Sequence, residues 1–356
     1  MKVRVLSRYG RTGASSRLRF MSYEAALRDA GIAMEVMPLF DDEYLKALYG
    51  HRSKGGQMAS GYAKRLRDML SPGDADLFWI QSEALPWVPW AIEQQLLPDR
   101  IPRAIDCDDA IFHRYDSHNS AFVRKVLGQK VDKSFANASI VTAGNSYLAS
   151  RAKAAGARNV EIVPTVVDID RYPEANKSGR SGKPIIGWIG TPNTWAEYID
   201  PKLNLLQNIA RENDAIIRGI GAPDMSIENV ETIRWSEEAE GTMIADCDIG
   251  IMPLSDAPFA RGKCGYKLIQ FMACGLPVVA SPVGVNVELV KHGINGFLAE
   301  TDEEWATALQ RLCADPELRI SMGKANRDLI RRDYSLQAWG PRVARILENA
   351  VDSNNR

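Results

Sequence analysis

Short β-branched runs alternate with longer amphipathic stretches along this chain, and that alternation is the feature that most constrains its fold. A helix between two strands allows them to lie parallel in one sheet, so the pattern predicts α/β architecture. Six predicted strands precede a polar segment at 173–184, and six follow it. The predicted strands are 2–6, 34–39, 76–81, 103–106, 139–143, 160–164, 185–190, 215–221, 230–235, 248–254, 277–281 and 296–300.

The polar segment 173–184 contains glycines and has a proline at each end, which is typical of a linker. The chain has 356 residues, more than one ordinary core holds, so two domains are expected. We expect two doubly wound, Rossmann-like domains facing each other across a cleft, at 1–175 and 176–335, with a helix at 336–352 packing back onto the first. Ligands of such sheets bind where the strands end.

Charge and cysteine content exclude several classes of protein. The formal net charge is -1, which argues against a protein that coats nucleic acid. The five cysteines are scattered and odd in number, which favours free thiols in a reducing compartment over disulfides or a zinc site. The sequence opens directly on a predicted strand and has no apolar run long enough to span a bilayer. We therefore expect a cytoplasmic protein, at most resting on the inner face of a membrane.

Three cations lie before and in the first turn of an apolar predicted helix at 265–275, which closes on Gly275. They are Arg261, Lys263 and Lys267. If the helical spacing extends back to Lys263, then Lys263, Lys267, Gln270 and Cys274 form one stripe. Cations at a helix start oppose the helix dipole unless an anion docks there, so a diphosphate clamp is one interpretation. A solvated face is the other.

A second polar cluster, at 104–116, follows a predicted strand of the first half. Asp106, Asp108 and Asp109 come together there, with His113 and Arg114 one turn later. Clustered carboxylates raise one another's pKa, so Asp108, Asp109 or His113 is a candidate to orient or deprotonate a hydroxyl. The Asp-x-Asp spacing is also compatible with Mg²⁺. A third interpretation is that Asp108 or Asp109 caps the following helix.

The segment 246–312 resembles the nucleotide-sugar-binding half of group 1 (family 4-like) glycosyltransferases of GT-B fold. The most specific part is "MACGLPVVAS", followed by Gly284, Glu288 and "NGFL". Further matches, in the family's order, are "GASSRLRF", the segment 138–172 and "IIGWIG". The resemblance implies transfer of a hexosyl group, with retention, from a nucleotide-diphosphate sugar to an acceptor hydroxyl. It implies no metal or other cofactor, a donor on the second domain and an acceptor on the first.

The same resemblance shows two departures from the family pattern. Gly262 and Gln270 stand where the family carries two glutamates, and the loop opening with Gly190 and Thr191 lacks the family's arginine and lysine. Lys263 and Lys267, with Arg261 third, are therefore expected to meet the diphosphate, and Gln270 to meet the ribose. The remaining donor-side candidates are Gly13, Gly190, Thr191, Trp235 and Glu288.

Each of these candidates also has an ordinary structural explanation. Gly13 belongs to a glycine-containing loop that is equally typical of a strand–helix turn. Trp235 is placed near the nucleotide base by the resemblance, but core packing is the commoner role for a lone tryptophan. Glu288 matches a family glutamate and is also a plain first-turn acid. Asp168 matches the family's hinge and is expected to be structural.

The acceptor expected from the resemblance is a glycan or lipid-linked glycan in cell-surface polysaccharide synthesis. The alternatives are a non-catalytic subunit that binds a nucleotide sugar or glycan, and a sugar-nucleotide epimerase or hydrolase on the same scaffold. Trp87 and Trp90 lie beside prolines after the basic stretch 62–70, which could rest on a membrane surface or pack as an ordinary helix.

Overall fold

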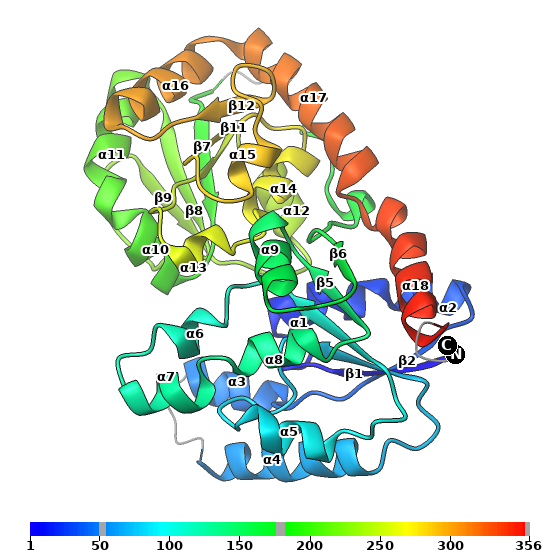
Figure 1. Ribbon diagram of the computed structural model, residues 1–356. Coiled ribbons are helices and arrows are strands. Elements are labelled where there is room, and N and C mark those ends of the chain that lie inside the picture. The colour runs from blue at the N-terminus through cyan, green and yellow to red at the C-terminus, as the bar shows by residue number, and fades with distance from the viewer. Residues whose placement is uncertain (50–54, 176–181, 353–356) are drawn as a thin grey trace. The chain divides into compact units, whose positions relative to one another are not determined.

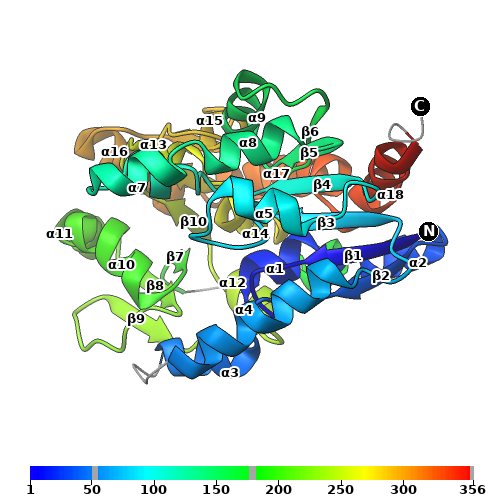
Figure 2. The same ribbon diagram turned by 60° about the horizontal axis from the view of Figure 1, so that its bottom comes forward.

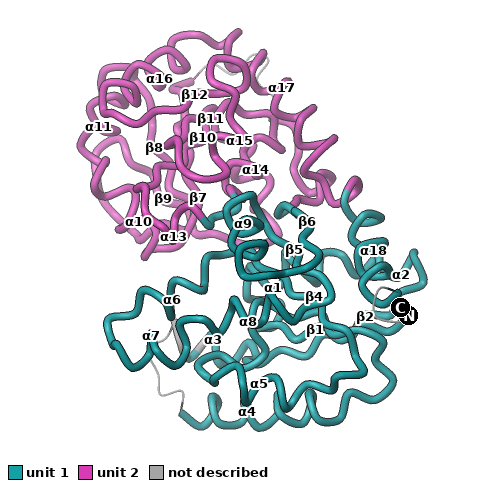
Figure 3. The backbone as a smooth tube through the Cα atoms, in the orientation of Figure 1, with its two compact units in different colours: residues 1–165, 262–264, 339–356 teal, residues 166–261, 265–338 magenta. Residues whose placement is uncertain are grey.

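The computed structural model describes residues 1–49, 55–175 and 182–352. The chain divides into two compact units (Figure 1, Figure 3). Unit 1 comprises 1–165, 262–264 and 339–356, and unit 2 comprises 166–261 and 265–338. Both units are parallel sheets flanked by helices, so the predicted α/β fold class is confirmed.

The sheet of unit 1 has the order β2-β1-β3-β4-β5-β6, with every neighbouring pair parallel. Its strands are β1 (Lys2–Leu6), β2 (Ala33–Val36), β3 (Leu77–Gln81), β4 (Arg103–Cys107), β5 (Ile140–Ala143) and β6 (Val160–Ile162). Its helical elements are α1 (Ala14–Arg19), η1 (Met21–Tyr23), α2 (Glu24–Asp29), α3 (Asp42–Tyr49), α4 (Gly55–Leu70), α5 (Trp90–Leu96), α6 (His113–Asp116), α7 (Ala121–Leu127), α8 (Lys130–Ala136) and α9 (Ser146–Ala154).

Both faces of this sheet are covered, because strand side chains alternate between them. Phe78 and Ile80 of β3 join the core that contains Phe135 of α8. Trp79 points the other way, and its ring meets Phe20 edge-on with 4.6 Å between centroids. This double burial explains why β3 and β4 are buried throughout.

The sheet of unit 2 has the order β12-β11-β10-β7-β8-β9, also entirely parallel. Its strands are β7 (Ile185–Ile189), β8 (Ile216–Ile220), β9 (Val230–Ile233), β10 (Ile249–Met252), β11 (Val278–Ala280) and β12 (Gly296–Leu298). This is the dinucleotide-binding Rossmann order, in which the chain reverses direction across the sheet between β7 and β10. All twelve predicted strands are therefore present.

Unit 2 has two buried cores, one on each face of its sheet. α10 and α11 lie beside β7 and β8 in both views (Figure 1, Figure 2), and α14 packs on β10 from the other core. The helical elements are η2 (Ile169–Arg171), α10 (Pro192–Tyr198), η3 (Asp200–Lys202), α11 (Leu203–Glu212), α12 (Glu240–Ala245), α13 (Pro258–Arg261), α14 (Tyr266–Ala273), α15 (Asn286–Leu289), α16 (Asp302–Ala314) and α17 (Pro316–Asp333).

The boundary between the units falls at 165/166 rather than at the expected 175/176. Residues 166–175 group with unit 2 because Val167 N donates to Tyr334 O and Ala175 N donates to Cys274 O. Part of the expected linker, 176–181, lies outside the described residues. The last helix, α18 (Leu336–Asp352), joins unit 1 from Trp339 onward. None of the described helices has the length and apolarity of a membrane span.

A buried ionic triad supports the core of unit 1. Lys130 Nζ lies 3.0 Å from Glu83 Oε2 and 2.9 Å from Glu93 Oε2, and all three side chains are buried. Glu93 also accepts hydrogen bonds from the backbone N–H groups of Ala84 and Leu85, which fixes the loop after β3. Removing one member of such a triad leaves the other charges buried and uncompensated.

We therefore expect Lys130→Met to lower the free energy of unfolding by about 3–5 kcal/mol. Urea denaturation followed by fluorescence measures the change. Lys133→Met is the matched control, because Lys133 is exposed on the same helix and its loss is expected to cost little. Equal stability of the two variants would show that the triad adds nothing to folding.

Candidate functional site

The carboxyl end of β7 carries Gly190, and two neighbours fill the space around it. A Cβ at Gly190 would lie 2.4 Å from the Trp188 ring and 2.7 Å from Lys267 Nζ. Gly221, after β8, has φ +76°, and a Cβ there would lie 2.3 Å from Gly190 O. Both positions exclude a side chain, so backbone from β7 and β8 is packed tightly at the point where a Rossmann sheet binds its ligand.

Lys267, in the first turn of α14, places its ammonium at this point. Its Nζ lies 4.3 Å from the centroid of the Trp188 ring, within cation–π range. The geometry at Gly190 shows that the same ammonium lies beside the loop that follows β7. A cation from α14 thus supplies positive charge to a loop whose sequence contains none.

Trp235 lies beside the same glycine pair, with its Cβ 3.3 Å from the position that a Cβ on Gly221 would take. The residue is 37% exposed. Its indole Nε1 donates to Glu240 Oε2 at 2.7 Å. The expected core-packing role is therefore wrong: Trp235 is a partly exposed aromatic ring anchored at one end.

Gln270 is buried and belongs to the hydrogen-bond chain that holds Trp235. It is 2% exposed, and its Nε2 donates to Tyr172 Oη at 3.0 Å. Tyr172 Oη donates in turn to Glu240 Oε1 at 2.5 Å. Burial, together with Tyr266 and Glu240, raises the pKa of Tyr172, so the phenol remains a proton donor. The amide expected to meet a ribose is thus committed to a chain of hydrogen bonds that ends at Trp235.

The other donor-side candidates of unit 2 have defined local roles. Thr191 forms a capping box with Thr194 at the start of α10. Arg261 makes a two-point ion pair with Asp256, with contacts of 2.6 and 2.8 Å. Glu288 is exposed in the first turn of α15. Asp168 caps η2 through Asp170 N, which agrees with the structural role expected for it.

Lys263 does not lie on the helix, so the predicted stripe is wrong. α14 begins at Tyr266, after Gly265 with φ +65°, and the residues before it leave the helical path. Residues 262–264 belong to unit 1, where Asn145 Nδ2 donates to both Gly262 O and Lys263 O at 3.0 Å. A Cβ at Gly262 would lie 2.7 Å from the backbone nitrogen of Ala110, so the glutamate typical of the resembling family does not fit there.

In unit 1, a buried ion pair organises the loop after β4. Arg19 Nε and Nη2 donate to the two oxygens of Asp106 at 2.9 and 2.7 Å. Thr142 Oγ1 donates to Asp106 as well, and Arg19 Nη1 donates to Val163 O. Asp106 is thus fully engaged and joins α1, β4, β5 and the end of β6.

Asp108 and Asp109 remain as the reactive pair of this loop. Ser15 Oγ donates to Asp108 Oδ2. Burial, followed by the negative charge of Asp106, raises the pKa of Asp108. Burial and the neighbouring Asp108 raise the pKa of Asp109 to about 7, against the lowering effects of Lys263 and Arg114. The helix α6 has no side-chain cap, so the expectation that one aspartate caps it is wrong.

The ring of His113 is already bonded at both nitrogens. Nδ1 lies 2.9 Å from Asp116 Oδ1, and Nε2 lies 2.8 Å from Tyr147 Oη. A role in proton transfer would require one of these bonds to break, so the geometry favours a structural role for His113 over the expected catalytic one.

Gly13 accommodates a neighbouring side chain. A Cβ at Gly13 would lie 2.5 Å from Tyr9 Cβ. The glycine therefore makes room for the side chain of Tyr9. The ligand-facing role expected for Gly13 has no geometric support.

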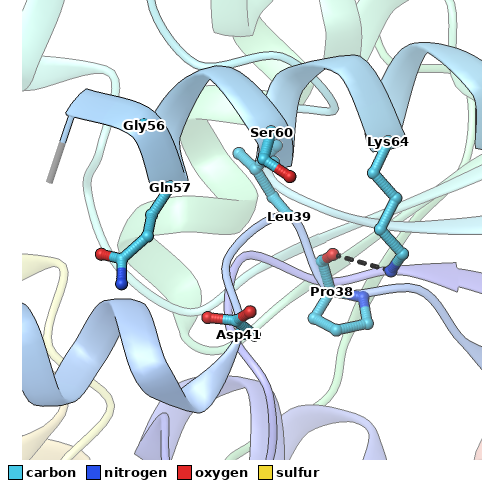
Figure 4. Close-up of a pocket in the computed structure, with 8 residues that line it drawn as sticks. Pro38, Leu39, Asp41, Gly56, Gln57, Ser60 and Lys64 are labelled. Carbon is cyan, nitrogen blue, oxygen red and sulfur yellow. Dashed lines mark hydrogen bonds between the residues drawn. The ribbon is translucent and has the colours of Figure 1, made fainter.

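Two other features of unit 1 could not be predicted from the sequence. Gln81, at the end of β3, bonds Arg8 N, Ser15 and Ser16, and so ties the loops after β1 and β3 together. A pocket of about 400 Å³ lies between α4 and the segment after β2 (Figure 4). Lys64 donates to Pro38 O at its wall, and none of the predicted site residues lines it.

Among the residues that the structure describes, no three His, Cys, Asp or Glu side chains are gathered so as to hold a metal ion. Asp106, the first acid of the Asp-x-Asp spacing, is bonded to Arg19 on both oxygens. This donor set does not fit the alternative of a Mg²⁺ site at 106–109.

The close packing around Gly221 predicts that an added side chain costs more stability there than at a glycine with open space around it. Gly221→Ala is expected to lower the free energy of unfolding by roughly 1–2 kcal/mol, because alanine disfavours the left-handed backbone conformation. The clash of its Cβ with Gly190 O is expected to lower it by about 1–3 kcal/mol more. Gly293→Ala is the control, since Gly293 has φ +80° but nothing within 4 Å of its Cβ position. Chemical unfolding of both variants measures the difference, and equal losses would contradict the close packing.

The raised pKa of Asp109 predicts the sign of a pH effect. The folded protein holds this proton more tightly than the unfolded chain, so ionisation of Asp109 destabilises the fold as pH rises from about 4 to about 7. Asp109→Asn is expected to remove this decline, which has a slope of up to about 1.4 kcal/mol per pH unit. Asp116→Asn is the contrasting control, because the pKa of Asp116 is lowered and its contribution is lost as pH falls. Unchanged pH dependence in Asp109→Asn would contradict the assignment.

Residues 183–315 match the family model described as glycosyl transferases group 1. Among curated proteins, a D-inositol 3-phosphate glycosyltransferase of Pseudarthrobacter chlorophenolicus is 31% identical over 163 residues, which are 43% of this chain and 36% of that protein. An N-acetyl-alpha-D-glucosaminyl L-malate synthase of Bacillus anthracis is 33% identical over 72 residues, 20% of this chain and 19% of that protein. The chain thus spans about a third or less of the length of these relatives.

Solved structures match nearly the whole chain. HepE of Anabaena, in complex with UDP and glucose, has a TM-score of 0.70 at 18% identity, covering 98% of this chain and 99% of that one. Sucrose-phosphate synthase of Thermosynechococcus elongatus has a TM-score of 0.70 at 14% identity, covering 99% and 100%. At these identities the likeness shows the fold. Residues 183–315 are therefore similar to group 1 glycosyl transferases, and the chain has the GT-B fold.

Proposed function

We propose that this protein transfers a hexosyl group from a nucleoside diphosphate sugar to an acceptor hydroxyl. The observation that carries the proposal is the position of Lys267, whose ammonium lies beside Gly190 at the carboxyl end of β7. That point borders the place where a Rossmann sheet binds nucleotides. The complexes of HepE with UDP and with UDP-glucose support a donor of this class.

On the donor side, Lys267 binds the diphosphate and stabilises its charge as the sugar–phosphate bond breaks. The Gly190–Thr191 backbone approaches the phosphates, and the exposed ring of Trp235 stacks on the base. Gln270 acts indirectly, because its amide holds Tyr172, Glu240 and hence Trp235 in place. Arg261, paired with Asp256, and Glu288, in the first turn of α15, are assigned no step.

On the acceptor side, Asp109 orients the acceptor hydroxyl, and its ionised form takes the proton as the oxygen bonds to the anomeric carbon on the face from which the diphosphate leaves, so that the configuration is retained. A pKa of about 7 suits this task, since the group is then both basic and partly ionised at neutral pH. Lys263 lowers the pKa of Asp109, so we assign Lys263 to this carboxylate rather than to the diphosphate. Asp108, held by Ser15, keeps the loop in position.

We further propose that the transfer retains the configuration at the anomeric carbon and needs no metal. The same proposal places the reaction at the cytoplasmic face of a membrane. The proposed acceptor is a glycan or lipid-linked glycan of the cell surface. WaaG, described as a glycosyltransferase of lipopolysaccharide biosynthesis, supports this setting, with a TM-score of 0.66 at 11% identity over 98% of this chain.

Lys267→Met tests the proposal directly. We expect this variant to bind UDP about ten- to a hundred-fold more weakly in isothermal titration, because a charged partner of the phosphates is lost. Lys291→Met is the control, since Lys291 is an exposed lysine of the same unit. UDP binding that is equal in wild type, Lys267→Met and Lys291→Met would contradict the donor site.

Lys263→Met separates the roles of the two lysines. We expect it to leave UDP binding unchanged and to raise the pKa of Asp109, so the acidic limb of the pH–rate profile moves to higher pH. If Lys263→Met lost UDP binding, Lys263 would instead be assigned to the diphosphate. Donor breakdown without an acceptor would favour a hydrolase or epimerase, and binding without turnover would favour a non-catalytic subunit.

A further inference from the structure

The exposed side of α7 in unit 1 carries two large apolar side chains, where a surface helix normally carries polar ones. Phe122 is 74% exposed and Val126 is 41% exposed. They are four residues apart and therefore share one side of the helix. The inward side of α7 is packed within unit 1, because Leu127 is part of the buried core and Val123 packs against that core. Packing within unit 1 therefore accounts for Val123 and Leu127 and leaves Phe122 and Val126 in solvent.

A third large apolar side chain lies next to the start of this helix. Trp87 is 47% exposed and has φ +62°, a conformation that a bulky residue adopts only under constraint. Its ring meets Tyr115 and His118 edge-on, with centroids 5.2 and 5.8 Å apart. His118 Nδ1 accepts from the backbone N–H of Ser120, the residue before α7, so His118 links Trp87 to the start of α7.

The surrounding charge is positive. Arg124 and Lys125 are exposed on α7, and the sequence has no acidic residue from 117 to 131. Arg124 Nη1 donates to His118 O and Asn119 O, which holds its guanidinium next to the residue that supports Trp87. Trp87, Phe122, Arg124, Lys125 and Val126 together form what we call the α7 patch.

We propose that the α7 patch docks on an anionic lipid surface. An aromatic and aliphatic face flanked by cations has the chemistry of an interfacial membrane contact: the apolar groups enter the headgroup region, and the cations meet the lipid phosphates. Trp90 takes no part, since it is buried at the start of α5. The basic stretch 62–70 that precedes the two tryptophans contributes no residue to the patch.

Vesicle co-sedimentation of the full chain tests the proposal. Wild type is expected to bind phosphatidylcholine vesicles that contain phosphatidylglycerol, and to bind pure phosphatidylcholine vesicles more weakly. Phe122→Ser is expected to weaken binding about tenfold through lost apolar insertion, and Lys125→Glu by at least about fivefold through lost attraction to the anionic headgroups. Added salt should weaken binding of wild type.

Ile294→Ser is the matched control, because Ile294 is an equally exposed aliphatic residue, 67% exposed, in unit 2. It should bind vesicles as wild type does. Absence of binding to anionic vesicles, or full binding by Phe122→Ser, would overturn the proposal. Self-association that Phe122→Ser abolishes, without lipid binding, would assign the patch to a second copy of the chain. UDP binding, measured in parallel, is independent of all these outcomes, so failure here does not affect the donor site.

Discussion

The Arg19–Asp106 pair is the interaction on which the loops after β4 and β6 depend. Burial alone would lower the pKa of Arg19, but Asp106, bonded to it at two points, raises that pKa, so the guanidinium stays charged inside unit 1. The pair connects the first helix with the ends of three strands. Asp106 also precedes Asp108 and Asp109 in the same loop. Burial, followed by the negative charge of Asp106, raises the pKa of Asp108, and burial, followed by Asp108, raises the pKa of Asp109.

Unit 2 meets a different constraint, which is the close packing of backbone at the carboxyl ends of two neighbouring strands. Glycines at 190 and 221 bring two strand ends into contact, and no side chain fits between them. The positive charge then comes from Lys267 on a separate helix, resting on the Trp188 ring. A chain of hydrogen bonds from Gln270 to Trp235 holds the tryptophan ring in place. Lys267 and Trp235 are therefore positioned by separate contacts.

Periodicity predicted the strands well, because burial on both faces leaves a strong apolar signal in each of them. It failed at Lys263, since helical spacing was extended through Gly265, whose left-handed backbone ends the regularity. It also could not reveal that Asn145, more than a hundred residues away, holds the 262–264 backbone. Trp235 and His113 were misjudged for a related reason: exposure and hydrogen-bond partners are set by tertiary contacts, which a residue type does not encode.

The grouping of residues 262–264 and 339–356 with unit 1 bears on how such a chain can be recombined. Neither unit is one continuous stretch of sequence, so cutting at a single junction near residue 165 does not separate them. A hybrid that joined the first half of this chain to the second half of a distant relative would receive a foreign tripeptide against Ala110 and Asn145. Even one side chain larger than glycine at position 262 would be excluded there. Exchange of donor specificity between relatives would therefore require this tripeptide and the last helix to travel with the first half.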